Sequence, residues 1–193
     1  MSQKKRSFIA VHFSSQVISA LDRIQNQLKQ SIGSKIKIKW VKPNNIHLTL
    51  QFLGDVEISR LDEISQVLSS AFKDVQAFEV SLANIGAFPS SHRPRVIWMG
   101  IPQGADKLEI LWTRVHQVTQ KFGFTQEDRP FKPHVTLGRV KDPQKSPGLS
   151  ESLEKHKAVS AQKCQIHQVH LMTSELRPTG PIYTNLDSFT LGE

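Results

Sequence analysis

A four-residue pattern occurs twice in the chain and limits its fold more than any other feature. Residues 47–50 read His-Leu-Thr-Leu and residues 134–137 read His-Val-Thr-Leu, so the second copy follows the first by 87 residues. A proline precedes each copy, Pro43 in the first case and Pro133 in the second. Repetition in a matching context indicates two copies of one structural unit, related by a pseudo-twofold axis.

Both copies lie in segments with the pattern of β-strands, 46–52 and 131–140. Successive side chains of a strand point to opposite faces, so the His and the Thr of each copy share one face. The residues between them are apolar and point to the other face. Two such strands related by a twofold axis would surround one cavity with His47, Thr49, His134 and Thr136.

The remaining apolar patterns predict an α+β fold. We expect strands at 7–13, 35–40, 46–52, 78–85, 95–101, 131–140, 165–172 and 183–191, and helices at 15–32, 58–72, 108–122 and 149–157. This order lacks the regular alternation that builds one parallel sheet. We therefore expect a single compact domain over 1–193 with two pseudo-twofold-related lobes, about 1–102 and about 103–193. Each lobe would have an antiparallel sheet and helices, and each would contribute one motif to a central cleft.

Composition narrows the class of protein. With 38% apolar and 22% charged residues among 193, the chain is typical of soluble globular proteins and unlike collagens, coiled coils or disordered chains. Its apolar runs are too short for a membrane helix, and none follows the basic N-terminus as in a secretory signal. Cys164 is the only cysteine, which excludes an internal disulfide and a cysteine-based metal site. We expect a cytoplasmic protein without a membrane partner.

The net charge is +8, from 25 Lys and Arg against 17 Asp and Glu. A basic chain attracts polyanions, although many soluble proteins are basic without binding nucleic acid. We expect this charge to lie around the cleft, at Arg139, the segment Lys35–Lys39 and the loop Arg93–Arg95. The alternating lysines at 35, 37 and 39 are typical of a solvated strand face; the alternative is that they guide a nucleic-acid backbone.

Two imidazoles and two hydroxyls suit a phosphodiester better than a metal ion, which would normally add a third ligand and carboxylate support. A neutral imidazole can take a proton from an attacking water, and a protonated imidazole can give one to the leaving oxygen. Threonine hydroxyls can bind the non-bridging oxygens, where charge develops. One His-x-Thr alone would say little, because the pattern is common; two copies in the same context favour catalysis.

These segments resemble a known family. Residues 39–54, KWVKPNNIHLTLQFLG, and 131–140, FKPHVTLGRV, are similar to the two motifs of the 2H phosphoesterases. The similarity is greatest to the RNA 2′,3′-cyclic phosphodiesterases, also called 2′-5′ RNA ligases. Residues 88–89, 95–98 and 171–176, with Gly180 and Tyr183, also match the family's pattern. The resemblance extends from about Ser7 to Leu191.

The resemblance implies roles for six residues. His47 would be the proton donor to the 3′ leaving oxygen, and His134 would be the proton acceptor that activates water. Thr49 and Thr136 would bind the phosphate. Phe52 and Arg139, each five positions after a motif histidine, would flank the terminal base, and both side chains can stack on one.

The resemblance also implies an activity: hydrolysis of RNA 2′,3′-cyclic phosphate ends to 2′-phosphomonoesters, without a metal or cofactor, and 2′-5′ RNA ligation without ATP. The expected partners are RNAs with cyclic phosphate ends, tRNA halves among them, and the expected state is a monomer. Two alternatives stay open. One is a nucleotide or RNA-end binding module without turnover, against which the matched histidines argue. The other is a 2′,5′-oligonucleotide or ADP-ribose cyclic phosphodiesterase on the same site, which only a substrate panel separates.

Overall fold

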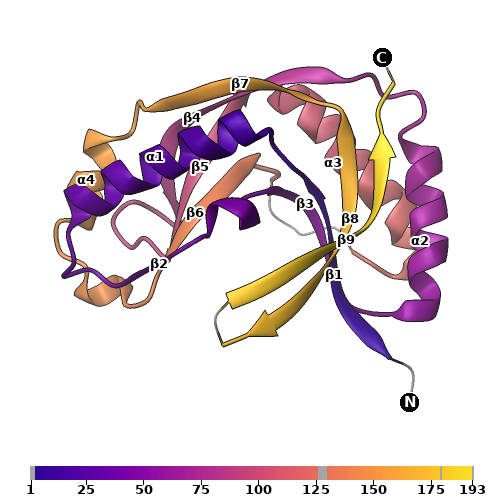
Figure 1. The fold of residues 1–193 in the computed structure, drawn as a ribbon, viewed down its shortest axis with the longest axis horizontal. Helices are drawn as coiled ribbons and strands as arrows, with labels where there is room; N and C mark the ends of the chain where they lie inside the picture. The colour runs from indigo at the N-terminus through magenta and orange to yellow at the C-terminus, as the bar shows by residue number, and fades with distance from the viewer. Residues whose placement is uncertain (1–2, 126–129, 179, 193) are drawn as a thin grey trace.

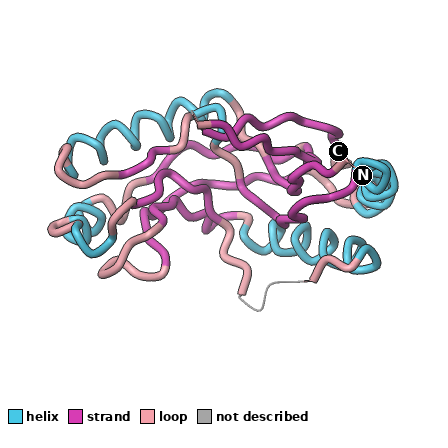
Figure 2. Tube along the Cα trace, turned by 90° about the horizontal axis from the view of Figure 1, so that it is seen from below, coloured by secondary structure: helices cyan, strands magenta, loops and turns pink. Residues whose placement is uncertain are grey.

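The computed structural model describes residues 3–125, 130–178 and 180–192, in which strands of two sheets lie between outer helices (Figures 1 and 2). The strands are β1 (Lys4–Val11), β2 (Ile38–Trp40), β3 (Leu48–Glu57), β4 (Phe78–Phe88), β5 (Val96–Gln103), β6 (His134–Val140), β7 (Ser160–Ile166), β8 (Gln168–Arg177) and β9 (Gly180–Thr190). The α-helices are α1 (Ser15–Ile32), α2 (Ile58–Ala71), α3 (Ala105–Thr119) and α4 (Leu149–Lys155). Short 3₁₀ turns cover Pro43–Asn45, Gln120–Phe122 and Pro143–Lys145.

The two sheets are antiparallel, which confirms the expected α+β class. The four-stranded sheet has the order β3-β1-β8-β9 and the five-stranded sheet the order β2-β6-β5-β4-β7. Each sheet contains strands from before and from after residue 102. The two sheets therefore do not correspond to the expected lobes, about 1–102 and about 103–193. The two motif strands belong to different sheets: β3 to the four-stranded one and β6 to the five-stranded one.

Helix α1 follows the start and stop signals in its sequence. The Ser14 side chain accepts a hydrogen bond from the Val17 amide, and Gly33 ends the helix with a φ of 72° that favours glycine. Its apolar stripe is buried, including Val17, Leu21 and Leu28. Within the described part of the chain, no helix combines the length and the apolar character needed to cross a membrane.

The apolar side chains form two clusters. The large cluster contains the inner faces of both sheets and the buried faces of all four α-helices. A small cluster of Phe8, Ala10 and Met172, with Tyr183 against it, lies on the other face of the four-stranded sheet. Since Ile9 and Val11 of β1 belong to the large cluster while Phe8 and Ala10 belong to the small one, β1 is buried on both faces.

Two strand predictions need correction. The segment from Gly86 was expected to be a loop, but β4 continues to Phe88. Gly86 is required there for packing, since a Cβ at this position would clash with the Trp98 ring. Strand β7 was not predicted, because only Ile166 of its seven residues is fully buried. It pairs only with β4 at the edge of its sheet, where the apolar alternation is weak.

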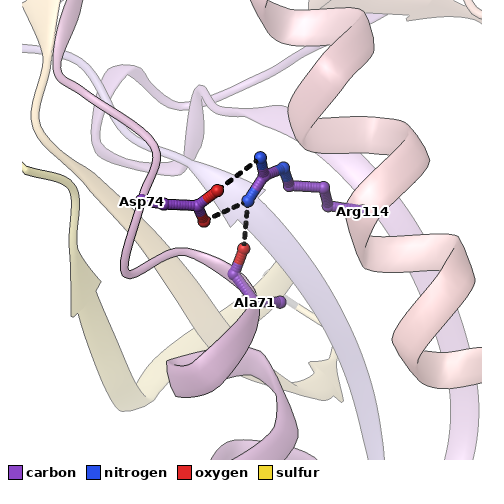
Figure 3. A network of polar contacts seen from close by, with 3 residues as sticks. All are labelled: Ala71, Asp74 and Arg114. Atoms are coloured by element: carbon purple, nitrogen blue, oxygen red, sulfur yellow. Dashed lines mark hydrogen bonds and ion pairs between the residues drawn. The ribbon is translucent and has the colours of Figure 1, made fainter.

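Helices α2 and α3 are joined by a polar contact (Figure 3). The Arg114 guanidinium donates to the Ala71 carbonyl oxygen over 3.0 Å and to both carboxylate oxygens of Asp74. The Ala71 carbonyl ends α2, so Arg114 satisfies one of the acceptors that a helix leaves unpaired at its C-terminus. The Arg114 guanidinium also lowers the pKa of the Asp74 carboxyl.

Candidate active site

Each motif strand contains a β-bulge at the same position of the motif. Along β3, Thr49 lies opposite Ala10 and Phe52 opposite Phe8, so three steps on β3 match two on β1. Along β6, Thr136 lies opposite Trp98 and Arg139 opposite Val96, which is again three steps against two. The extra residue follows the threonine in both strands, and bulges of this kind are typical near active sites.

The bulges determine which side chains share a face. Thr49 and Phe52 are an odd number of residues apart, so a regular strand would direct them to opposite faces, and the same holds for Thr136 and Arg139. With one extra residue, each pair lies on one face. We call the faces that carry these pairs the histidine faces of the two sheets. Leu50 and Leu137, which follow the threonines, stay in the large core.

The imidazoles of both motifs are held in the same way. Nδ1 of His47 bonds the carbonyl oxygen of Asn45 over 2.9 Å, and Nδ1 of His134 bonds the carbonyl oxygen of Lys132. In both cases the carbonyl lies two residues before the histidine. A carbonyl oxygen only accepts, so Nδ1 carries the hydrogen and Nε2 is left to gain or lose a proton.

Each imidazole also meets two aromatic rings. Tyr183 lies edge-on to His47 at a ring-centroid distance of 5.2 Å, and Phe8 lies at 4.9 Å. Phe88 lies edge-on to His134 at 5.0 Å, and Trp98 lies at 6.1 Å. This matched packing fixes the ring orientations, and it removes water from both imidazoles.

Burial lowers the pKa of both histidines, while the bond to the backbone carbonyl raises it in part. The pKa of His47 falls to about 4, and the nearby His12 and Arg139 also lower it. Arg139 lowers the pKa of His134 as well. Both imidazoles are therefore mainly neutral at pH 7 in the free protein.

Arg139 acts on ionisable side chains of both sheets. It projects from β6, yet its positive charge acts on His47 and Tyr183 of the other sheet as well as on His134 of its own. Strands β3 and β6 contact each other, and the Val41 amide donates to the Leu137 carbonyl oxygen over 2.9 Å. The two contacting strands therefore each contribute one imidazole and one threonine hydroxyl to the candidate site.

Gln25 of α1 forms hydrogen bonds to the backbone near both motifs. It is buried, and its Nε2 donates to the Val41 carbonyl oxygen over 2.9 Å and to the Leu137 carbonyl oxygen over 2.7 Å. Leu137 directly follows Thr136 at the bulge of β6. Sequence reasoning did not identify Gln25, although a signal existed, because it is a polar residue between Leu21 and Leu28 on the buried face of the helix.

The β8–β9 hairpin reaches the first motif through its backbone. The Asn45 side-chain amide donates to the Pro181 carbonyl oxygen over 3.1 Å, and Asn45 also holds His47. Figure 1 shows this hairpin extending beyond the body of the molecule. Tyr183 is therefore brought to His47 by a strand from the far end of the chain.

A third imidazole lies beside the first motif. The His12 ring is 6.4 Å from that of His47 and stacks on His170 at 4.6 Å. His170 Nδ1 is 3.0 Å from the Ser188 hydroxyl, and burial and His12 lower the pKa of His170 to about 4. Neither His12 nor His170 belongs to the repeated motif. Among the described residues, no three His, Cys, Asp or Glu side chains form a group suited to a metal ion.

Comparison with known proteins finds relatives that match most of the chain. The chain is 35% identical over 174 residues to an Aquifex aeolicus protein named RNA 2′,3′-cyclic phosphodiesterase. The alignment covers 90% of this chain and 92% of that protein. A Methanothermobacter thermautotrophicus protein of the same name is 34% identical over 188 residues, covering 97% of this chain and 100% of that one.

Solved structures share the fold. Protein TT0787 of Thermus thermophilus superposes with a TM-score of 0.80 at 28% identity, over 97% of this chain and 99% of that one. E. coli LigT complexed with 3′-AMP has a TM-score of 0.78 at 21% identity, over 99% and 100% of the two chains. The family model described as "LigT like Phosphoesterase" matches residues 11–98 and 100–183. The chain therefore belongs to the LigT-like phosphoesterase family.

Proposed function

We propose that the protein hydrolyses RNA 2′,3′-cyclic phosphate ends to 2′-phosphomonoesters by two-histidine acid–base catalysis. The observation that carries this proposal is the matched pair of imidazoles, each with Nδ1 bonded to a backbone carbonyl and Nε2 left for proton transfer. The relatives named RNA 2′,3′-cyclic phosphodiesterase support the substrate class.

In the proposed reaction, a water oxygen attacks the phosphorus and the bond to the 3′ oxygen breaks. His134 takes the proton of the water as the new P–O bond forms. His47 gives a proton to the departing 3′ oxygen, which becomes the 3′ hydroxyl, and the phosphate stays on the 2′ oxygen. Each transfer typically contributes ~10²–10⁴-fold, and departure of the 3′ rather than the 2′ oxygen is what the family resemblance implies.

The proposed donor must be protonated when the substrate is bound. In the free protein the pKa of His47 is about 4, because the ring is buried beside His12 and Arg139. An anionic phosphate beside the ring favours the charged imidazolium and raises this pKa. Substrate binding and loading of the proton on His47 are therefore coupled.

The other site residues bind the substrate. The Thr49 and Thr136 hydroxyls, one from each histidine face, donate to the non-bridging phosphate oxygens. Phe52, of which 59% is exposed, and the exposed Arg139 flank the terminal base. A phenyl ring and a planar guanidinium both stack on a base.

The proposal extends to the setting of the reaction. We propose a monomeric protein with one domain, acting in the cytoplasm on RNA ends such as tRNA halves, without a metal or cofactor. Cys164 as the only cysteine of the chain fits a reducing compartment. A 5′ hydroxyl that attacks the cyclic phosphate in place of water, with the 3′ oxygen again departing, would join RNA halves through a 2′-5′ bond without ATP.

A panel of cyclic nucleotides tests the proposal. The protein is incubated with nucleoside 2′,3′-cyclic and 3′,5′-cyclic phosphates, with excess chelator in a parallel series, and the products are identified by phosphorus NMR. We expect 2′-monophosphates from the 2′,3′-cyclic substrates, at the same rate in chelator. Tight binding without hydrolysis of any substrate would instead indicate a binding module, and loss of turnover in chelator would indicate a metal ion.

A further inference from the structure

Four cations lie on one exposed face of the strand pair β2–β6. Lys39 is directly opposite Arg139 in the register of these strands. The Lys141 amide donates to the Lys37 carbonyl oxygen over 2.9 Å, which continues the pairing by two residues. Ile36, Ile38 and Trp40 pack against the core, so the side chains of Lys37 and Lys39 point to the opposite face. We call Lys37, Lys39, Arg139 and Lys141 the basic strip.

The basic strip is unfavourable for the isolated protein. Like charges directly opposite each other destabilise a strand pair, and the strip contains two such pairs in succession. All four side chains are exposed. Among the ion pairs formed by the described residues, none includes a member of the strip. No neighbouring carboxylate therefore offsets the repulsion, so an external anion would relieve it.

The strip is continuous with the candidate active site. Its member Arg139 lies on the histidine face of β6, and its charge acts on both motif histidines. From Thr136 to Lys141 the extended chain spans about 16 Å at roughly 3.3 Å per residue. A chain anchored by its terminal phosphate at Thr136 and by its base at Arg139 would reach Lys39, Lys37 and Lys141 with its next phosphates.

We propose that the basic strip binds the sugar–phosphate backbone of the nucleotides that precede the cyclic phosphate in a single-stranded RNA. This inference rests on the proposed function, and it adds a direction for the RNA: away from the histidines, along β2 and β6. It also makes the length of the substrate matter. A mononucleotide reaches only the histidines and Arg139, whereas an oligonucleotide also neutralises the lysines.

The test compares the double variant Lys37→Gln/Lys141→Gln with the control variant Lys73→Gln/Lys107→Gln. All four lysines are exposed, and both variants remove two charges. The control positions lie after α2 and in α3, two elements outside the strand pair β2–β6. The substrates are a nucleoside 2′,3′-cyclic phosphate and a short oligoribonucleotide with the same cyclic phosphate end. The ratio of kcat/KM for the oligonucleotide to that for the mononucleotide is measured against salt.

We expect a lower ratio for Lys37→Gln/Lys141→Gln at low salt and an unchanged ratio for the control. The slope of log(kcat/KM) for the oligonucleotide against log[salt] should fall in magnitude by about 1.4, since each contact to a single strand contributes roughly 0.7. Equal effects of the two variants would overturn the strip as a binding surface.

A binding measurement separates this inference from the proposed function. Fluorescence anisotropy of a labelled oligoribonucleotide with a 3′ hydroxyl end reports backbone binding without turnover. If no cyclic phosphate is hydrolysed but binding weakens only in Lys37→Gln/Lys141→Gln, the proposed function fails and the strip stands. If hydrolysis proceeds but binding is the same in both variants, the strip fails alone.

Discussion

Single residues set the chemistry of the site through the atoms that surround them. A carbonyl two residues upstream fixes Nδ1 of each motif histidine, and aromatic rings cover the rest of the imidazole. The identity of the histidines and threonines could be predicted from the sequence, because the motif repeats. Their low pKa values could not, because burial by Tyr183 and Phe88 depends on strands far away in the chain.

Replacing Arg139 tests this electrostatic account. Arg139 lowers the pKa of both His47 and His134, so the variant Arg139→Gln should raise both values. The bell-shaped profile of kcat/KM against pH, which reports the free enzyme, should then shift to higher pH. The KM for a nucleoside 2′,3′-cyclic phosphate should also rise, because the proposed stacking partner of the base is lost. An unshifted profile would mean that Arg139 lies too far from the imidazoles to act on them.

At the scale of elements, the two bulges place Phe52 and Arg139 on the same faces as Thr49 and Thr136. Alternation alone places His and Thr on one face, and it would place Phe52 and Arg139 on the other. The register that corrects this comes from pairing with β1 and β5, which is not visible in either motif. Edge strand β7 was missed for a related reason, since its polar sequence has little apolar alternation.

Gln25 is expected to position the second bulge through the Leu137 carbonyl oxygen. The variant Gln25→Leu keeps the volume but leaves that carbonyl with one donor fewer, and Gln25→Glu replaces the donating amide by an acceptor. Both should lower kcat/KM for nucleoside cyclic phosphates mainly through KM, because Thr136 and Arg139 move while the imidazoles stay in place.

Gln25→Asn serves as the conservative variant, since it retains an amide donor on a shorter side chain and should restore part of the affinity. Thermal unfolding of each variant separates a local change from general loss of the fold. If kcat/KM of the variants falls only in proportion to their melting temperature, and KM does not change, a positioning role would be contradicted.

At the scale of the whole molecule, the chain passes back and forth between the two sheets. The four-stranded sheet combines β1 and β3 with β8 and β9, so its strands come from both ends of the sequence. The sequence predicts the two antiparallel sheets and the repeat, but it cannot show this interleaving, because strand pairing over long separations leaves no local pattern. The result is a site whose parts come from distant segments, such as Phe8, His47 and Tyr183.

The buried histidines link the stability of the whole fold to pH. His47 and His170 have pKa values of about 4 in the folded protein, below the ordinary histidine value of 6.5. Between these values the unfolded chain binds protons that the folded chain does not, so stability falls as pH falls through this window. The urea midpoint should be lower at about pH 5 than at about pH 7, and less so in His47→Gln. The same pH dependence in the variant would argue against a buried, neutral His47.

Turnover by variants of the two motif histidines tests the central claim most directly. His47→Ala, His134→Ala and the double variant are compared with the unchanged protein, using single-turnover hydrolysis of a nucleoside 2′,3′-cyclic phosphate. Because the proposed donor and acceptor act as one unit, each single variant should lose about 10²–10⁴-fold and the double variant little more. Near-full turnover by either single variant would contradict the proposed acid–base pair.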